Sequence, residues 1–207
     1  MRVLITAGPT REPIDAVRFI SNRSSGAMGL SLARAAQAAG HAVTLLLGPI
    51  THPPALPPEI TVLPFSSAAD LEALLAQHFP ACDLLVMAAA VADFRPVEVS
   101  GGKTERGGSL TIQLAATPDL VAGCAARRRP GQKVVAFALE EPGSLERRAK
   151  AKMQRKGVDA IVANPLATMD ADAIEGTLYF ADGRQVSPGK LTKPAFAAWL
   201  MGALGQP

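Results

Sequence analysis

The feature that most constrains the fold of this chain is a regular alternation of short apolar runs with alanine-rich stretches of helical periodicity. Several apolar runs lack polar alternation, which is typical of parallel strands buried on both faces. The predicted strands are Arg2–Ala7, Ala42–Leu47, Thr61–Pro64, Leu84–Ala89, Leu110–Leu114, Lys133–Ala138 and Ala160–Ala163. The predicted helices are Ser25–Ala39, Ala68–Gln77, Pro118–Ala126, Leu145–Lys156 and Pro194–Leu204. This order indicates an α/β fold with a Rossmann-like, doubly wound, mostly parallel sheet.

One segment interrupts this alternation and another lies near its end. Val97–Ser109 holds four glycines around Lys103-Thr104-Glu105-Arg106 and offers little apolar surface for packing, so it predicts a flexible flap. Near the end of the chain, Gly176–Phe180 and Arg184–Val186 flank a short turn, which predicts a hairpin before the last helix. Neither an internal repeat nor a linker is evident, so residues 1–207 are expected to form one domain.

The composition argues against several classes of function. The 207 residues include 21 Lys and Arg against 18 Asp and Glu, and only 4% are aromatic, so no surface for stacking nucleic-acid bases is expected. Because no apolar run reaches the roughly 18 residues of a membrane span, and the first strand is too short for a signal peptide, we expect a cytoplasmic protein without a membrane helix. The cysteines and histidines lack disulfide or metal-ligand spacing, and a GxSxG hydrolase motif is absent.

The first candidate site follows the first predicted strand, at the sheet edge where open α/β folds bind ligands. It lacks both GxGxxG and the Walker A pattern, so a dinucleotide fingerprint and a P-loop are not indicated. Two loops contribute to the candidate phosphate or substrate site: Gly8, Thr10 and Arg11 in the first, and Asn22, Ser24, Ser25 and Gly26 in the second. The second loop enters a helix whose N-terminal N–H groups favour an anion. Simple helix capping by Ser24 or Ser25 is the alternative.

Two further groups of residues have chemical potential. The small residues from Ala88 to Ala92 would let a flat ring approach the backbone, and Asp93 could then hold a ribose hydroxyl or a metal ion; an ordinary turn is the alternative. Lys152 and Lys156 share a helix face, and Lys103 on the flap could close over phosphates. For these lysines, a solvated position is the alternative.

Taken together, these segments resemble phosphopantothenoylcysteine synthetase, a coenzyme A biosynthetic ligase that in many bacteria forms the C-terminal half of a bifunctional flavoprotein. The resemblance spans nearly the whole chain. The motifs that carry it are Thr6-Ala7-Gly8-Pro9-Thr10-Arg11-Glu12-Pro13-Ile14-Asp15, then Arg18-Phe19-Ile20-Ser21-Asn22-Arg23-Ser24-Ser25-Gly26-Ala27-Met28-Gly29, and Ala89-Ala90-Val91-Ala92-Asp93-Phe94-Arg95-Pro96.

The resemblance implies a phosphopantothenate–cysteine ligase. The carboxylate of 4′-phosphopantothenate would attack the α-phosphate of a nucleoside triphosphate, CTP in the bacterial enzymes, and the amine of cysteine would then displace CMP. Mg²⁺ is expected to bridge the triphosphate, and flavin is not expected in this chain. The resemblance further implies a homodimer, in which the flap closes over a neighbour's site, and a separate or fused flavin-dependent decarboxylase as partner.

Position by position, the resemblance assigns two catalytic residues, Asn22 for the acyl intermediate and Lys103 as the first lysine of the flap. It assigns a larger set to the nucleotide: Met87, Ala88, Ala89, Asp93, Lys103, Pro118, Asp119, Leu120, Val121, Phe137, Lys152 and Lys156. Protein ligands for the metal are not assigned.

The sequence also departs from the family pattern. The flap has Glu105 and Arg106 where the family has lysines, and a carboxylate near a triphosphate is unfavourable. Ala27 stands where the family often has lysine, Leu139 lies in its FAAET-like stretch, and Asn164-Pro165 replaces its Asn-Asp. These changes motivate an alternative, a non-catalytic or altered-specificity nucleotide-binding protein of the same fold. The choice of CTP over ATP follows from the family alone. A Rossmann oxidoreductase is a third possibility, but the chain lacks its glycine fingerprint.

Overall fold

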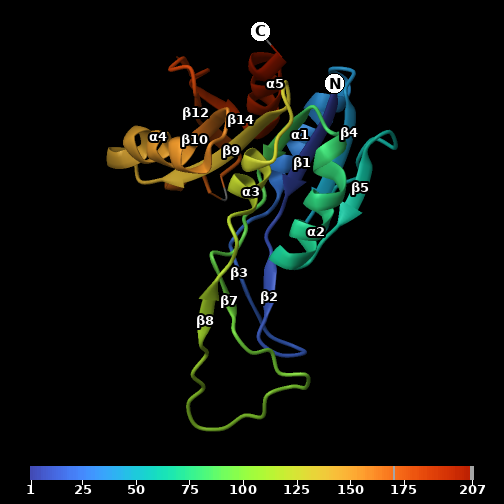
Figure 1. Cartoon of the computed structure of the whole chain (residues 1–207), viewed down its shortest axis with the longest axis vertical. Coiled ribbons are helices and arrows are strands. Elements are labelled where there is room, and N and C mark those ends of the chain that lie inside the picture. The colour runs from blue at the N-terminus through green and yellow to red at the C-terminus, as the bar shows by residue number, and fades with distance from the viewer. Residues whose placement is uncertain (170, 206–207) are drawn as a thin grey trace.

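A computed structural model describes residues 1–169 and 171–205. Its centre is an eight-stranded sheet in the order β13-β12-β10-β9-β6-β1-β4-β5 (Figure 1). The six strands from β10 to β5 in this order are parallel, and β12 and β13 are antiparallel additions at one edge. Their bounds are β1 Arg2–Ala7, β4 Ala42–Leu47, β5 Thr61–Pro64, β6 Leu84–Met87, β9 Lys133–Glu140, β10 Ala160–Pro165, β12 Thr177–Phe180 and β13 Gln185–Val186. The prediction of a mostly parallel α/β sheet with a C-terminal hairpin is confirmed.

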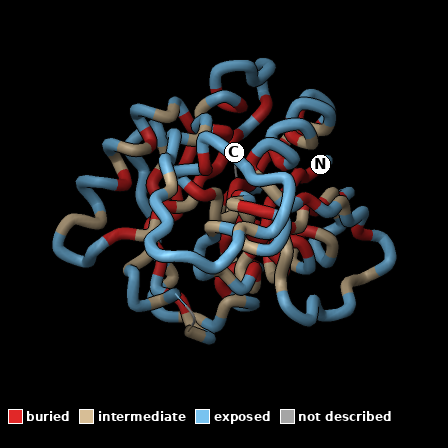
Figure 2. Tube along the Cα trace, turned by 90° about the horizontal axis from the view of Figure 1, so that it is seen from below, coloured by how far each residue is buried: buried red, intermediate tan, exposed pale blue. Residues whose placement is uncertain are grey.

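Helices cover both faces of this sheet. They are α1 Ala27–Ala38, α2 Ala68–His78, α3 Leu120–Ala126, α4 Leu145–Lys156 and α5 Lys193–Gly205. Alternate residues of the strands point to opposite faces, so Val3 and Ile5 pack with α1 and α5, while Leu4 packs with α2, α3 and α4. The buried residues accordingly gather at the centre of the trace (Figure 2).

Short elements complete the chain. The 3₁₀ turns are η1 Phe79–Ala81, η2 Pro142–Ser144 and η3 Leu166–Thr168. The two-stranded ribbons pair β2 Arg11–Pro13 with β3 Phe19–Ser21, β7 Phe94–Pro96 with β8 Leu114–Ala116, and β11 Ala173–Glu175 with β14 Lys190–Thr192. The first two ribbons and the loop between β7 and β8 project away from the sheet (Figure 1), and we call them the arm.

The arm corrects one predicted strand. Leu110–Leu114 does not join the central sheet, because only Leu114 is in a strand, and that strand pairs with β7 on the arm. Leu110 is 59% exposed, so its apolar character reflects a surface position rather than a sheet core. A periodicity argument cannot separate these two cases for a run of five residues.

Two helices begin two residues later than predicted. Helix α3 begins at Leu120 rather than Pro118, because the Oδ1 atom of Asp119 accepts a hydrogen bond from the N–H of Ala122 and caps the helix. Helix α1 begins at Ala27 rather than Ser25, because Gly26 has a left-handed backbone with φ of 72°.

Candidate functional site

The carboxyl ends of β1, β6, β9 and β10 meet at one edge of the sheet, and two cavities open there. The larger, about 580 Å³, lies beside the N-terminus of α1, and we call it the α1 cavity. The smaller, about 390 Å³, lies beside α3 and α4, and we call it the α3–α4 cavity. Four residues line both cavities and form their shared wall: Ala90, Asp93, Phe137 and Lys152.

Hydrogen bonds join the loop after β1 to the segment after β6. The buried hydroxyl oxygen of Thr6 accepts from the N–H of Ala89, and the hydroxyl oxygen of Thr10 accepts from the N–H of Ala92, each at 3.0 Å. The backbone adds a bond from Ala90 to Gly8 and one from Thr10 to Ala90. These bonds hold the shared wall in place by pairing backbone groups with buried partners.

This scaffold changes the position expected for three predicted residues. Gly8, Thr10 and Arg11 were predicted to contact phosphate or substrate, but none of them lines either cavity. Thr10 is fully buried, and the guanidinium of Arg11 lies 4.5 Å from the ring centre of Phe19 on the arm. The end of β1 does reach the edge of the sheet where the cavities open, but Thr10 supports the segment after β6 and Arg11 packs on the arm.

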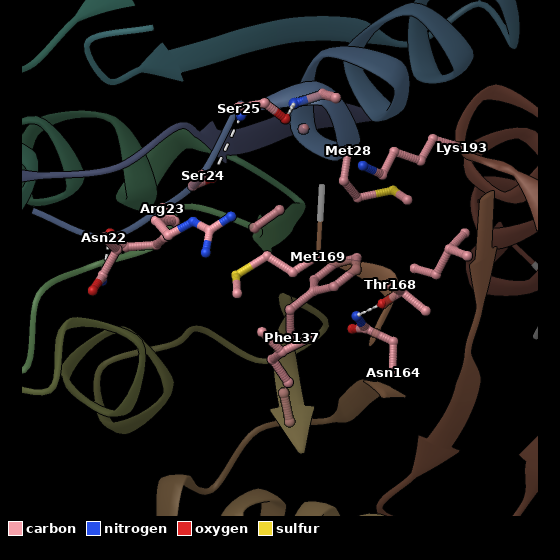
Figure 3. Close-up of a pocket in the computed structure, with 18 of the residues that line it drawn as sticks. Asn22, Arg23, Ser24, Ser25, Met28, Phe137, Asn164, Thr168, Met169 and Lys193 are labelled. Atoms are coloured by element: carbon pink, nitrogen blue, oxygen red, sulfur yellow. Dashed lines mark hydrogen bonds between the residues drawn. The ribbon is translucent and has the colours of Figure 1, made fainter. Parts of the chain in front are cut away.

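The second predicted loop does line the α1 cavity. Asn22, Ser24, Ser25 and Gly26 all contribute to its wall, together with Arg23 (Figure 3). Gly26 is the N-cap residue of α1 and offers no side-chain cap. The hydroxyl oxygen of Ser24 accepts from the N–H of Gly26, and that of Ser25 accepts from the N–H of Ala27, each at 3.4 Å. The two serines thus support the start of the helix as well as line the cavity.

Asn22 has a specific set of partners. Its Nδ2 donates to the carbonyl oxygen of Val91 at 3.0 Å and to that of Ala90 at 3.2 Å. Because both acceptors are carbonyl oxygens, the NH₂ group of the amide must face them, and Oδ1 points away from these two bonds. Asn22 thus joins the α1 loop to the shared wall.

The α1 cavity has further lining residues that the resemblance does not assign to a ligand. They are Leu139, Asn164, Thr168, Met169, Ile174 and Lys193. The amide of Asn164 donates to the hydroxyl of Thr168 at 2.6 Å, and that hydroxyl donates to the carbonyl of Pro165 at 2.7 Å (Figure 3). The comparison with the family pattern draws attention only to Leu139 and Asn164 among these residues, whereas Lys193 comes from the start of α5, far along the chain.

The α3–α4 cavity collects most of the predicted nucleotide residues. Its lining includes Met87, Ala89, Asp93, Pro118, Asp119, Leu120, Val121, Phe137, Lys152 and Lys156. Arg155 also lines it, although the resemblance does not assign this residue to the nucleotide. Ala88 lines the α1 cavity instead.

The two predicted lysines of α4 form ion pairs. Nζ of Lys156 lies 2.6 Å from Oδ2 of Asp119, and Nζ of Lys152 lies 2.5 Å from Oε1 of Glu140. Burial raises the pKa of the Asp119 carboxyl, but the hydrogen bonds from Lys156 and from the N–H of Ala122, together with the charges of Lys156 and Arg155, outweigh this and leave the pKa below its ordinary value. Asp119 is therefore ionised at neutral pH.

Lys103 is the one residue assigned to the nucleotide that lines neither cavity. It is exposed on the flap. The neighbouring Thr104 is anchored to the β2–β3 turn, because its N–H donates to Oδ2 of the buried Asp15 at 3.2 Å. The flap is thus held within its charged stretch, and the loop between β7 and β8 projects away from the central sheet of the same chain (Figure 1).

Two absences apply to the described residues alone. Residues 1–169 and 171–205 contain no group of three or more His, Cys, Asp or Glu side chains placed to hold a metal ion. Over the same residues, no helix is both long and apolar enough to span a bilayer.

The fold and the site define a Rossmann-like α/β domain with two joined ligand cavities at the carboxyl edge of its sheet. Residues 1–206 match the model of the DNA/pantothenate metabolism flavoprotein C-terminal domain, and the chain belongs to this family.

Similar proteins support this assignment. The chain is 39% identical over 218 residues to the coenzyme A biosynthesis bifunctional protein CoaBC of Mycobacterium tuberculosis H37Rv, covering 98% of this chain and 51% of that protein. It is 46% identical over 166 residues to a cysteine/cysteine sulfinic acid decarboxylase of an unknown prokaryotic organism, covering 80% and 46% respectively. The crystal structure of a CoaBC C-terminal domain matches with a TM-score of 0.84 and 34% identity, covering 98% of this chain and 93% of that one. The chain spans about half the length of the curated relatives it matches.

Proposed function

We propose that this chain is a phosphopantothenate–cysteine ligase that activates 4′-phosphopantothenate with CTP and joins it to cysteine. The observation that carries the proposal is the wall shared by the two cavities. Activation requires the carboxylate of one substrate to reach the α-phosphate of another, and fixing both reactants in adjacent sites supplies much of the rate enhancement. Family membership supports this chemical interpretation of the two sites.

The α3–α4 cavity is the proposed nucleotide site. Lys152, Arg155 and Lys156 give it three cations, which suit the charge of a triphosphate. The small side chains of Ala89 and Ala92 leave the backbone open to a flat base. Mg²⁺ is commonly held by one or two carboxylates together with substrate phosphates. We propose that it enters with the triphosphate, next to Asp93, and offsets charge as pyrophosphate leaves.

The α1 cavity is the proposed site of 4′-phosphopantothenate. The first N–H groups of α1 face this region and carry the positive end of the helix dipole, which favours the phosphate monoester. Lys193 adds a cation to the lining of the same cavity and lies beside Met28 of α1 (Figure 3). The acyl end of the substrate would then reach the shared wall.

The chemistry proceeds in two displacements. A carboxylate oxygen of the substrate attacks the α-phosphorus of CTP, and pyrophosphate leaves, which produces an acyl-cytidylate. The amine nitrogen of cysteine then attacks the acyl carbon, loses a proton and expels CMP. Asn22 lies at the junction where both steps occur. We propose that one of its N–H groups exchanges the longer contact, to Ala90, for the acyl oxygen as negative charge develops there.

The position of Lys103 supports a homodimer. A flap that projects from its own sheet edge can deliver Lys103 to the nucleotide of a partner chain. Apolar side chains also stand exposed on the arm, among them Val17, Phe94 and Leu114, and a second copy would cover them. We further propose that a flavin-dependent decarboxylase, fused or separate, acts on the product. A cytoplasmic location remains a prediction.

Release of the nucleoside monophosphate tests the proposal. Purified protein would be incubated with Mg²⁺, 4′-phosphopantothenate and either CTP or ATP, with and without cysteine. We expect cysteine-dependent CMP release, and AMP release in its place would correct the nucleotide. If folded protein bound nucleotide but released neither monophosphate, the ligase proposal would be overturned.

A second candidate is a non-catalytic nucleotide-binding protein of the same fold. It is favoured by Leu139, whose side chain takes up space in the α1 cavity, and by Glu105, which places a negative charge on the flap. This candidate predicts nucleotide binding without amide formation. The same assay distinguishes the two, and replacing Leu139 with alanine would restore turnover if its bulk is the obstacle.

A further inference from the structure

A buried carboxylate, Glu140, lies behind the site within the FAAET-like stretch, and neither the resemblance nor the cavity linings assign it a role. Glu140 is the last residue of β9, its side chain is 4% exposed, and it lines neither cavity. Its Oε1 lies 2.5 Å from Nζ of Lys152, and its Oε2 accepts a hydrogen bond from Nη1 of Arg148 at 3.4 Å. Burying an unpaired charge is very unfavourable, so these two cations permit a carboxylate at this position.

Lys152 is the more significant partner because its side chain lines both cavities. Glu140 reaches it from the end of β9 and lines neither cavity. Its Oε1 forms an ion pair with Nζ of Lys152 but accepts no hydrogen bond within the described residues. The three N–H donors of the ammonium can therefore meet a ligand at the shared wall while the ion pair is kept.

The charge pattern of α4 explains why such a hold is needed. Arg148, Lys152 and Lys156 follow one another at four-residue intervals, and like charges at this spacing on a helix repel each other. Each lysine of this helix has a carboxylate partner, in the pairs Lys150–Glu146, Lys152–Glu140 and Lys156–Asp119. Of these three carboxylates, Glu140 is the buried one, with 4% exposure against 58% for Glu146 and 42% for Asp119. The ammonium at the shared wall thus has the most firmly fixed partner.

The charge state of Glu140 is consistent with this role. Burial raises the pKa of its carboxyl, but its interactions with Lys152 and Arg148 outweigh that effect. The pKa consequently lies below its ordinary value, and Glu140 is ionised at neutral pH.

We propose that Glu140 is a positioning residue, which holds the ammonium of Lys152 at the wall between the two cavities so that it can bind the phosphates of the nucleotide. This inference rests on the proposed function, because it assigns the held ammonium to a nucleotide. Glu140 itself touches no substrate. Its effect passes entirely through Lys152.

The same carboxylate could instead weaken nucleotide binding, so the direction of the change in affinity on its removal distinguishes the two roles. If Glu140 mainly offset the charge of Lys152, its removal would strengthen the positive potential of the α3–α4 cavity and tighten nucleotide binding. If it positions Lys152, its removal releases the ammonium to the repulsion of Arg148 and Lys156, and binding weakens.

The decisive variant is Glu140→Gln, which keeps the size of the side chain and an acceptor oxygen but removes the charge. We expect the Kd and the KM for CTP to rise on the order of tenfold, with a smaller change in kcat. In a Lys152→Gln background, the same substitution should change CTP affinity by less than about twofold, since the residue acts through Lys152. Binding is measured by calorimetry and turnover by CMP release.

Glu146→Gln is the matched control, because it removes the carboxylate of another Lys–Glu pair on the same helix, outside both cavities, and should leave the KM unchanged. Unchanged or tighter CTP binding by folded Glu140→Gln would overturn the positioning role. So would an undiminished tenfold loss in the Lys152→Gln background, which would indicate a structural effect.

The two levels of the proposal fail in different ways. A wild-type protein that neither binds CTP nor releases CMP overturns the proposed function and the role of Glu140 together. A fully active wild type with an unaffected Glu140→Gln variant overturns the role of Glu140 alone. If thermal unfolding shows that Glu140→Gln does not fold, Glu140→Asp replaces it. This variant keeps the charge but moves it away by one methylene, and the same rise in the Kd and KM for CTP is expected.

Discussion

At the carboxyl edge of the sheet, polar groups are buried and hydrogen-bonded, whereas on the arm apolar side chains are exposed to solvent. Thr6 and Thr10 are fully buried, and each accepts a backbone N–H from the segment after β6. On the arm, Val17, Phe94 and Leu110 are 61%, 54% and 59% exposed. The first region is completed by its own chain, and the second is not.

This difference separates what one chain supplies from what it lacks. The sheet edge provides two cavities, a shared wall and a set of paired cations without help from another molecule. The arm carries Lys103, which reaches neither cavity. Binding of substrates is thus expected to depend on the sheet edge alone, and full turnover on a second copy of the arm.

The largest expected effect comes from the centre of the sheet edge. Asn22→Ala should lower kcat on the order of 10²–10³-fold, because it removes a donor to the acyl oxygen and releases the bonds to Ala90 and Val91. The measurement is the steady-state rate of CMP release. Gln37→Ala, in α1 and outside both cavities, is the control. Normal turnover by Asn22→Ala would remove it from the catalytic site.

The next prediction tests whether the arm acts on a partner chain. Lys103→Ala should lower turnover strongly on its own, because the flap loses its point charge for the phosphates. When it is mixed with Asn22→Ala under conditions that exchange subunits, half of the dimers are mixed and have one intact site. Activity should then return to about a quarter of the wild-type value. No recovery, with exchange verified by mass, would show that the flap serves its own chain.

A pair of glycine substitutions compares the packing of the two regions directly. A Cβ at Gly29 would lie 2.3 Å from Cβ of Ala7, so Gly29→Ala must push α1 away from β1 and should cost about 1–3 kcal/mol of unfolding free energy. A Cβ at Gly101 on the flap would meet nothing within 4 Å, so Gly101→Ala should change stability by less than about 0.5 kcal/mol. Denaturant unfolding measures both. Equal effects would contradict the contrast in packing.

The same contrast explains how far the sequence could predict the molecule. The strands Arg2–Ala7 and Ala42–Leu47 and the helix Leu145–Lys156 have the predicted bounds, because buried apolar runs and helical periodicity are local signals. The predicted strand Leu110–Leu114 was wrong, because an exposed apolar residue on the arm has the same local pattern as a buried one.

The residues of the candidate site also differ in how well the sequence predicts them. Motifs identified Asn22, Lys152 and Lys156, whose residue types suggest chemistry by themselves. Lys193 and Glu140 were missed as functional residues because their importance depends on neighbours that are distant in sequence. Lys193 reaches the α1 cavity only through the packing of α5, and Glu140 gains its role only once β9 and α4 lie side by side.

The smallest expected effect concerns the anchor of the arm. Asp15 is buried, accepts N–H bonds from Val17, Arg18 and Thr104, and pairs with the Arg18 guanidinium at 2.7 Å. The hydrogen bond from the N–H of Val17 has the largest influence. Together with those from Arg18 and Thr104, it holds the pKa of the Asp15 carboxyl well below the ordinary value. A depressed pKa in the folded state adds stability that is present above the ordinary Asp pKa of about 3.9 and is lost as pH falls toward the folded value. Asp15→Asn should therefore reduce the acid dependence of stability below about pH 4.

Local opening provides the direct readout of this anchor. Hydrogen exchange of the flap amides should accelerate in Asp15→Asn at neutral pH, because Thr104 loses a charged acceptor, while exchange in β1 stays unchanged. Since Asp15 lies outside both cavities, CTP affinity should be preserved and only turnover should fall. A loss of CTP affinity in this variant would show that the arm and the sheet edge are coupled within one chain, and the division between them would then have to be abandoned.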